Sequence, residues 1–136
     1  MLVRIGDWEQ ALSEYLTDQE KVPHSFGSHD CALFGAGAVL AMTGADPAAE
    51  FRGKYQTAAG AVKALIRFGA GTLEQTMDAK FPIMPIGYAR RGDLVFYQSN
   101  VGVMWVGFAL FAGEEGAFEG LVRIPRADIY KAWAVG

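Results

Sequence analysis

The chain has 136 residues, of which 51% are hydrophobic and 20% are charged, with a formal net charge of −3 at pH 7. This length favours one domain over residues 1–136, built around one core. The acidic balance argues against a nucleic-acid-binding surface, which usually carries a basic excess. A single cysteine, Cys31, excludes an internal disulfide framework.

Targeting and membrane signals are weak along the sequence. The first residues lack the long apolar region of a signal peptide. The most apolar segment, Cys31 to Met42, is shorter than the roughly 20 residues that cross a bilayer. We therefore expect a soluble protein that folds in a cytoplasm and has no membrane span.

The first elements in chain order are two helices. An amphipathic pattern predicts a helix over 7–20, with Asp7 as its N-cap and Gln10 completing a capping box. A second helix is expected over 29–43, capped by Ser28 and ended by Gly44. Because it has almost no polar residue after its first turn, this helix should be buried on all sides. The inward face of the first helix is formed by Trp8, Leu12, Tyr15 and Leu16.

Three shorter segments follow before the sheet. Residues 44–55 predict a turn and a short helix, with Asp46 at the N-cap and Pro47 at the first helical position. A further helix over 57–69 is expected to turn its large apolar residues inward, namely Val62, Leu65 and Ile66. The next helix, over 72–81, opens with a capping box of Thr72 and Gln75.

The second half of the sequence predicts strands. Short β-rich runs are separated by turn residues and cover 94–98, 101–107, 108–112, 120–124 and 131–135. Helices followed by strands are typical of an α+β domain with an antiparallel sheet, here of about five strands. The run "MWVGFALFA" at 104–112 is apolar on both faces, which indicates a sheet that is buried on both sides rather than an interface.

Cys31 has two interpretations. In the first turn of a helix, the positive end of the helix dipole favours the thiolate, which is a nucleophile for acyl transfer. A free cysteine is also commonly a small buried apolar residue. The neighbouring His24 and His29 are expected on surface loops. Successive residues of a helix point about 100° apart, so His29 is poorly placed to deprotonate Cys31. Asp30, as a first-turn acid, would suit the helix dipole but raise the thiol pKa.

Metal and cofactor sites are not indicated. One cysteine and two histidines at this spacing match no zinc pattern. We therefore expect neither a metal nor a cofactor.

The motifs "HDCALF" at a helix start and "RRGDLVFYQSNVGVMWVG" later in the chain resemble the NlpC-type cysteine endopeptidases. This family has a compact papain-like fold and cleaves the stem peptides of peptidoglycan. The segments "GSHDCALF", "TGADPAAEFRGKY", "AAGAVKAL" and "AWAVG" resemble more closely a small phage relative found beside tail-tip and baseplate-hub genes.

The resemblance implies roles for individual residues. Cys31 matches the nucleophile, and Gly92-Asp93-Leu94 matches the turn into the first strand of the family. Asn100 occupies the place of the catalytic histidine, and asparagine cannot take the thiol proton. The groove between Cys31 and Asn100 is the candidate site, and we expect Tyr97 and Gln98 to line it.

Three functions follow from these expectations. The first is a structural component of a phage tail tip or baseplate hub, made in the cytoplasm of the bacterial host and then carried in the virion tail tip. Its partners would be other tail proteins. The second is an active peptidase or amidase on peptidoglycan, in which Cys31 attacks, His29 or another group acts as the base and Asn100 orients it. The third is a small-ligand binder with no phage connection.

Overall fold

The computed structural model describes residues 2–113 and 120–136. Among the described residues, four helices precede all the strands: α1 (Trp8–Gln19), α2 (Cys31–Thr43), α3 (Ala58–Phe68) and α4 (Leu73–Lys80). The strands are β1 (Ile83–Met84), β2 (Leu94–Tyr97), β3 (Asn100–Met104), β4 (Phe108–Ala112), β5 (Leu121–Pro125) and β6 (Lys131–Trp133). Two 3-10 turns, η1 (Ile86–Tyr88) and η2 (Arg126–Asp128), complete the described elements.

The strands form one antiparallel sheet in the order β1-β6-β2-β3-β4-β5. The α+β class is therefore confirmed, and the sheet has six strands rather than the expected five. The additional strand, β1, is two residues long and pairs Ile83 with Trp133. A segment this short, between Pro82 and Pro85, is too brief to show the alternation that predicts a strand.

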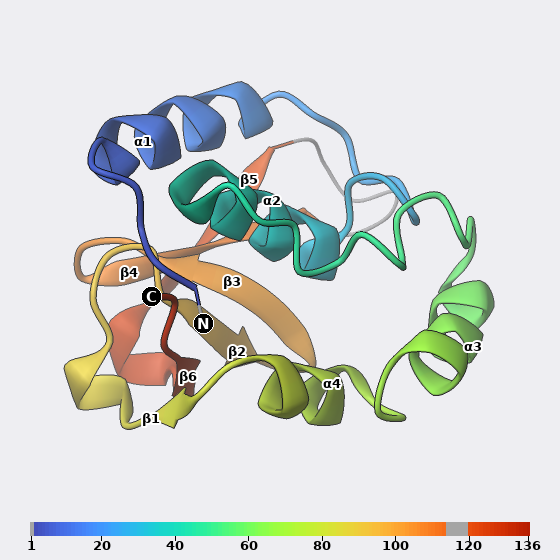
Figure 1. Ribbon diagram of the computed structural model, residues 1–136. Helices are drawn as coiled ribbons and strands as arrows, with labels where there is room; N and C mark the ends of the chain where they lie inside the picture. Colours follow the sequence, from blue (N-terminus) through green and yellow to red (C-terminus); the bar gives the residue numbers. More distant parts are fainter. Residues whose placement is uncertain (1, 114–119) are drawn as a thin grey trace.

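Both faces of the sheet are covered. Helices α1 and α2 lie over one face, with α1 above α2 and α2 across β3 (Figure 1). The core on this side includes Leu12, Phe34, Val39, Val101 and Trp133, all at most 1% exposed. The other face is packed by residues of the η1 and η2 segments, so the expectation of a sheet buried on both sides is confirmed.

Helix α2 is the central helix of the fold and is largely buried, but Leu40 is 42% exposed, so the expected burial on all sides is not complete. Eight of its residues are buried, and Gly44 ends it with a φ of +80°. Its beginning differs from the expectation, because Asp30 rather than Ser28 is the N-cap. The Asp30 carboxylate accepts hydrogen bonds from the backbone of Leu33 (3.0 Å) and Gly27 (3.1 Å) and from the Tyr55 hydroxyl (2.5 Å). Ser and Asp are both common N-cap residues, and the hydrogen bond from Tyr55, 25 residues away, favours Asp30 over Ser28.

Of three other local expectations, two are corrected and one is confirmed. Asp7 precedes α1 without capping it through its side chain, and Gln10 instead donates to Glu14 at 3.1 Å. Residues 46–53 form turns rather than a helix, with Asp46 paired to Arg52 at 2.7 Å. The capping box at the start of α4 is present as predicted.

Helix α3 is oriented as expected at Leu65 but not at Val62 and Ile66. Leu65 packs against the buried residues around Ala64, whereas Val62 and Ile66 are 57% and 67% exposed. The backbone approaches Tyr55 closely at Gly60, where an added Cβ would lie 3.1 Å from the Tyr55 Cβ. The inward face of α3 therefore includes Ala64 and Leu65, and the expectation for Val62 and Ile66 is wrong.

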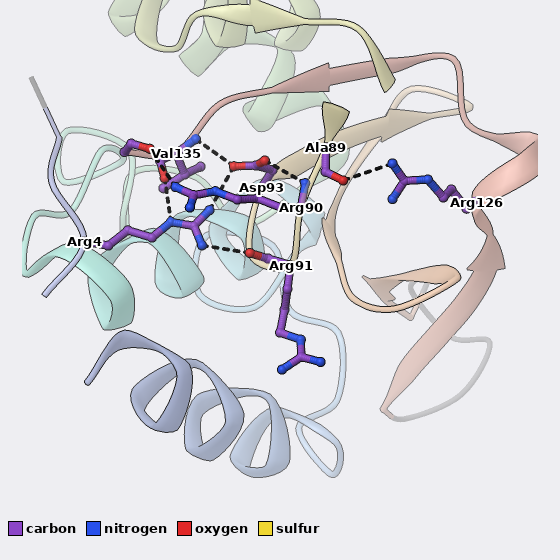
Figure 2. Close-up of polar contacts among 8 residues, drawn as sticks. Arg4, Ala89, Arg90, Arg91, Asp93, Arg126 and Val135 are labelled. Carbon is purple, nitrogen blue, oxygen red and sulfur yellow. Dashed lines mark hydrogen bonds and ion pairs between the residues drawn. The ribbon is translucent and has the colours of Figure 1, made fainter. Parts of the chain in front are cut away.

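A buried ion pair holds the two ends of the chain together (Figure 2). Arg4 donates to the Asp93 carboxylate (2.9 Å) and to the backbone carbonyls of Val135 (2.7 Å) and Arg91 (2.8 Å). Asp93 also accepts from the backbone amides of Arg90 (2.9 Å) and Val135 (3.0 Å). We refer to Arg4, Asp93 and Val135 as the terminal clasp.

Candidate functional site

Cys31 is the first residue of α2, directly after the N-cap Asp30. The sequence predicted it two positions further into the helix, because it placed the cap at Ser28. The residue lies in the wall of a cavity of about 310 Å³, which is bounded by α2, α3, α4 and the 47–55 segment. Asn100, at the start of β3, lines the same cavity. The expected proximity of these two residues is therefore present.

The β2–β3 hairpin positions Asn100. Its two turn residues, Gln98 and Ser99, have φ values of +47° and +65°. Positive φ at both positions suits the twist of a two-residue hairpin but is strained for residues other than glycine. The Asn100 side chain donates to the Gln98 carbonyl at 3.1 Å. This contact holds the amide at the turn, where Asn100 lines the cavity.

The thiol of Cys31 is poorly suited to ionise. Burial and, to a smaller extent, the Asp30 carboxylate raise its pKa to about 11. The backbone amides of Val101, Ala32 and Cys31 itself favour the thiolate but do not outweigh the burial. At neutral pH only about one thiol in ten thousand would be ionised.

The two histidines behave differently from each other. His29 is 5% exposed, so its expected place on the surface is wrong. Its ring packs edge-on against Phe34 in the core, with a centroid distance of 6.1 Å, and it does not line the cavity. Burial lowers the pKa of His29 and thereby favours the neutral ring. The structure therefore does not bring His29 into the cavity with Cys31.

His24 is the histidine at the cavity. It lines the wall with Cys31 and Asn100, and its Nδ1 is buried without a hydrogen-bond partner among the described residues. Its ring lies edge-on to Phe26 at 4.5 Å between centroids. The sequence gives little signal for this placement, since the loop between α1 and α2 has to fold back before His24 can reach the cavity.

Two further expectations about the lining are wrong. Tyr97 and Gln98 do not line the cavity. The Tyr97 ring instead packs against Phe111, with a centroid distance of 6.1 Å. The lining includes Tyr55, which the sequence did not single out; its pKa is raised by burial and by the hydrogen bond that it donates to Asp30.

Among the residues that the structure describes, no three histidine, cysteine or acidic side chains gather closely enough to bind a metal ion. Within residues 2–113 and 120–136, none of the helices has both the length and the apolar character needed to cross a bilayer.

Comparison with known proteins gives one family. A family model described as a domain of unknown function, DUF6950, matches residues 3–135. No curated protein matches the chain. The family match covers α1 to α4 and all six strands, including the cavity with Cys31 and Asn100. The chain therefore belongs to the DUF6950 family.

Proposed function

We propose that this protein is a non-catalytic relative of the NlpC-type peptidases, which serves as a structural component of a phage tail tip or baseplate hub. The relationship is supported by a buried helix that opens with Asp30-Cys31 and packs against an antiparallel sheet. The tail-tip assignment is supported by the resemblance of the sequence motifs. Its partners are then other tail proteins, and it is made in the host cytoplasm before it joins the virion.

The loss of catalysis is supported by one observation, the state of Cys31. Burial holds its pKa near 11, and the β3 residue that lines the same cavity is Asn100, whose amide does not titrate and cannot accept the thiol proton. A cysteine nucleophile needs either a neighbouring base or a lowered pKa. Cys31 is thus retained mainly for its packing at the start of α2.

An active peptidase is the second candidate, and the position of His24 favours it. His24, Cys31 and Asn100 line one cavity, so an imidazole, a thiol and an amide lie in the same site. In this alternative His24 rather than His29 would take the thiol proton. The thiolate would then attack a peptide carbonyl of peptidoglycan.

The pH dependence of Cys31 alkylation distinguishes the two candidates. The rate with iodoacetamide is measured from pH 6 to pH 11 on the folded protein, with urea-unfolded protein as the reference for an unperturbed thiol. For a non-catalytic site, the rate should rise about tenfold per pH unit up to pH 10. A plateau below pH 8 that disappears in His24→Ala would instead support the peptidase.

Complementation tests the structural role. A phage that lacks the gene is supplied with the wild-type protein, with Cys31→Ala or with His24→Ala. If the protein is structural, both variants should restore tails and plaque formation. Normal particles that fail to infect with Cys31→Ala, together with loss of peptidoglycan cleavage, would contradict the proposal.

A further inference from the structure

The cavity beside Cys31 has a wall that is mainly apolar. Helix α3 contributes Ala61 and Leu65 to it, while its larger neighbours Val62 and Ile66 face solvent. Opposite α3, the wall is formed by side chains from α2, α4 and the segments beside them. The main apolar contributors there are Leu33, Phe51, Leu73, Met77 and Phe81.

Three polar side chains in this wall, those of Tyr55, Lys80 and Thr76, already have partners. Tyr55 donates to Asp30, and Lys80 donates to Glu50, in each case at 2.5 Å. The Thr76 hydroxyl donates to the Thr72 carbonyl at 2.7 Å and accepts from the Ala70 amide at 3.0 Å.

The remaining polar groups also offer little to a ligand. Asn100 donates to the Gln98 carbonyl, and His24 Nδ1 lies within the wall rather than on its surface. A bound group would therefore gain few hydrogen bonds and would be held by burial of apolar surface.

The size of the cavity limits the length of an apolar ligand. An apolar cavity of about 150 Å³ accommodates benzene, which has six carbon atoms. The cavity here has a volume of about 310 Å³, roughly twice as large. It therefore matches a chain of about ten to twelve carbon atoms.

We propose that this cavity binds a saturated acyl chain of about ten carbon atoms, with its polar end toward solvent. The inference rests on the proposed function in one respect: if Cys31 is not catalytic, the cavity beside it can bind an acyl chain without cleaving it. The acyl chain could belong to a free fatty acid or to an ester, since both present the same hydrocarbon to the wall.

Calorimetric titration with sodium alkanoates of six to fourteen carbons tests the proposal. Affinity should rise about fourfold for each added methylene. The rise should stop near ten to twelve carbons, where the chain fills the cavity. Methyl decanoate is titrated in parallel. Tighter binding of decanoate would identify a free acid, and tighter binding of the ester would identify an esterified chain.

Two matched substitutions on α3 locate the binding. Ala61 lines the cavity, whereas Ala59 on the same helix is exposed. Ala61→Leu adds three carbon atoms to the wall, so it should weaken decanoate binding about 60-fold and shorten the best chain by about three carbons. Ala59→Leu adds the same atoms to the surface and should leave binding unchanged.

The outcomes separate this inference from the proposed function. Absence of binding, equal effects of the two substitutions, or affinity that keeps rising through fourteen carbons would overturn the acyl-chain site. A cavity that binds decanoate should also protect Cys31 from iodoacetamide. Failure of the proposed function would appear separately, as rapid Cys31 alkylation at neutral pH without any alkanoate present.

Discussion

Removal of the Asp93 carboxylate should destabilise the protein more than any change at an exposed ion pair. The side chains of Arg4 and Asp93 are only 5% and 2% exposed. In Asp93→Ala the Arg4 guanidinium remains buried with two carbonyl acceptors but without its counter-charge. The backbone amides of Arg90 and Val135 lose their carboxylate acceptor at the same time (Figure 2).

The magnitude follows from the burial of the pair. Loss of one partner of a buried ion pair costs about 3–5 kcal/mol. The two amides add to this cost, but the effects overlap because all three donors share one carboxylate. We therefore expect Asp93→Ala to lower the free energy of unfolding by about 4 kcal/mol. The double variant Arg4→Met, Asp93→Ala should lose less free energy of unfolding than the sum of the two single variants, because it leaves no unpaired buried charge.

Urea unfolding followed by circular dichroism measures the effect. With a slope of about 2 kcal/mol per molar urea, the midpoint should fall by about 2 M. Arg52→Ala is the matched control, since the Arg52 and Asp46 side chains are 34% and 19% exposed. It should cost at most about 1 kcal/mol. If the two substitutions had equal effects, the reasoning from burial would be refuted.

Three further predictions concern stability. The fold raises the pKa of the Cys31 thiol from 9.0 to about 11. Its contribution to the free energy of unfolding is therefore complete below pH 9 and is lost as the pH rises to 11. Over this range the free energy of unfolding of the wild type, measured in urea, should therefore fall by about 3 kcal/mol relative to that of Cys31→Ala. If the unfolding free energies of the two proteins changed in parallel with pH, the raised pKa would be contradicted. Gly102→Ala should lower the free energy of unfolding by about 1–3 kcal/mol in a thermal unfolding experiment, since the added Cβ would lie 2.5 Å from the Phe111 ring. Adding Phe111→Leu should restore part of this stability. If it restored none, the ring would be excluded as the cause. Val62→Lys with Ile66→Lys should change stability in urea by less than about 0.5 kcal/mol per site, whereas a loss of several kcal/mol would indicate that these residues face inward.

The sequence predicts those elements whose signals are local. The capping box at Thr72 needs only a residue three positions away, and Gly44 ends α2 through its own backbone freedom. The strands β2 to β6 are β-rich runs between turns, and all five were expected. The burial of β3 and β4 on both faces follows from apolar residues at consecutive positions.

Elements decided by distant contacts were predicted less well. The pattern of α3 correctly indicates an amphipathic helix, but the close approach of Gly60 to Tyr55 turns its small residues inward. Asp30 becomes the N-cap of α2 because Tyr55 and Gly27 also bind its carboxylate. Neither contact can be read from the local pattern around these helices.

The candidate site was predictable in part. Cys31 and Asn100 were expected to meet because the resemblance aligns them on a helix start and a strand start. The place of His24 depends on the path of a loop, and the raised pKa of Cys31 depends on how closely that loop and β3 surround the thiol. Both are tertiary effects, so residue spacing alone could not separate an active thiol from an inactive one.

The terminal clasp also affects how the chain could be connected. Arg4 binds the Val135 carbonyl directly, and the two ends of the chain lie side by side in Figure 1. A short glycine-rich peptide could therefore join residues 4 and 135 into a circular backbone with little rearrangement of the fold. Closing a loop of this size removes entropy from the unfolded chain equivalent to about 5 kcal/mol at 25 °C. A circular form would keep the same sheet and cavity, and it could be opened at a new position such as the turn between α3 and α4.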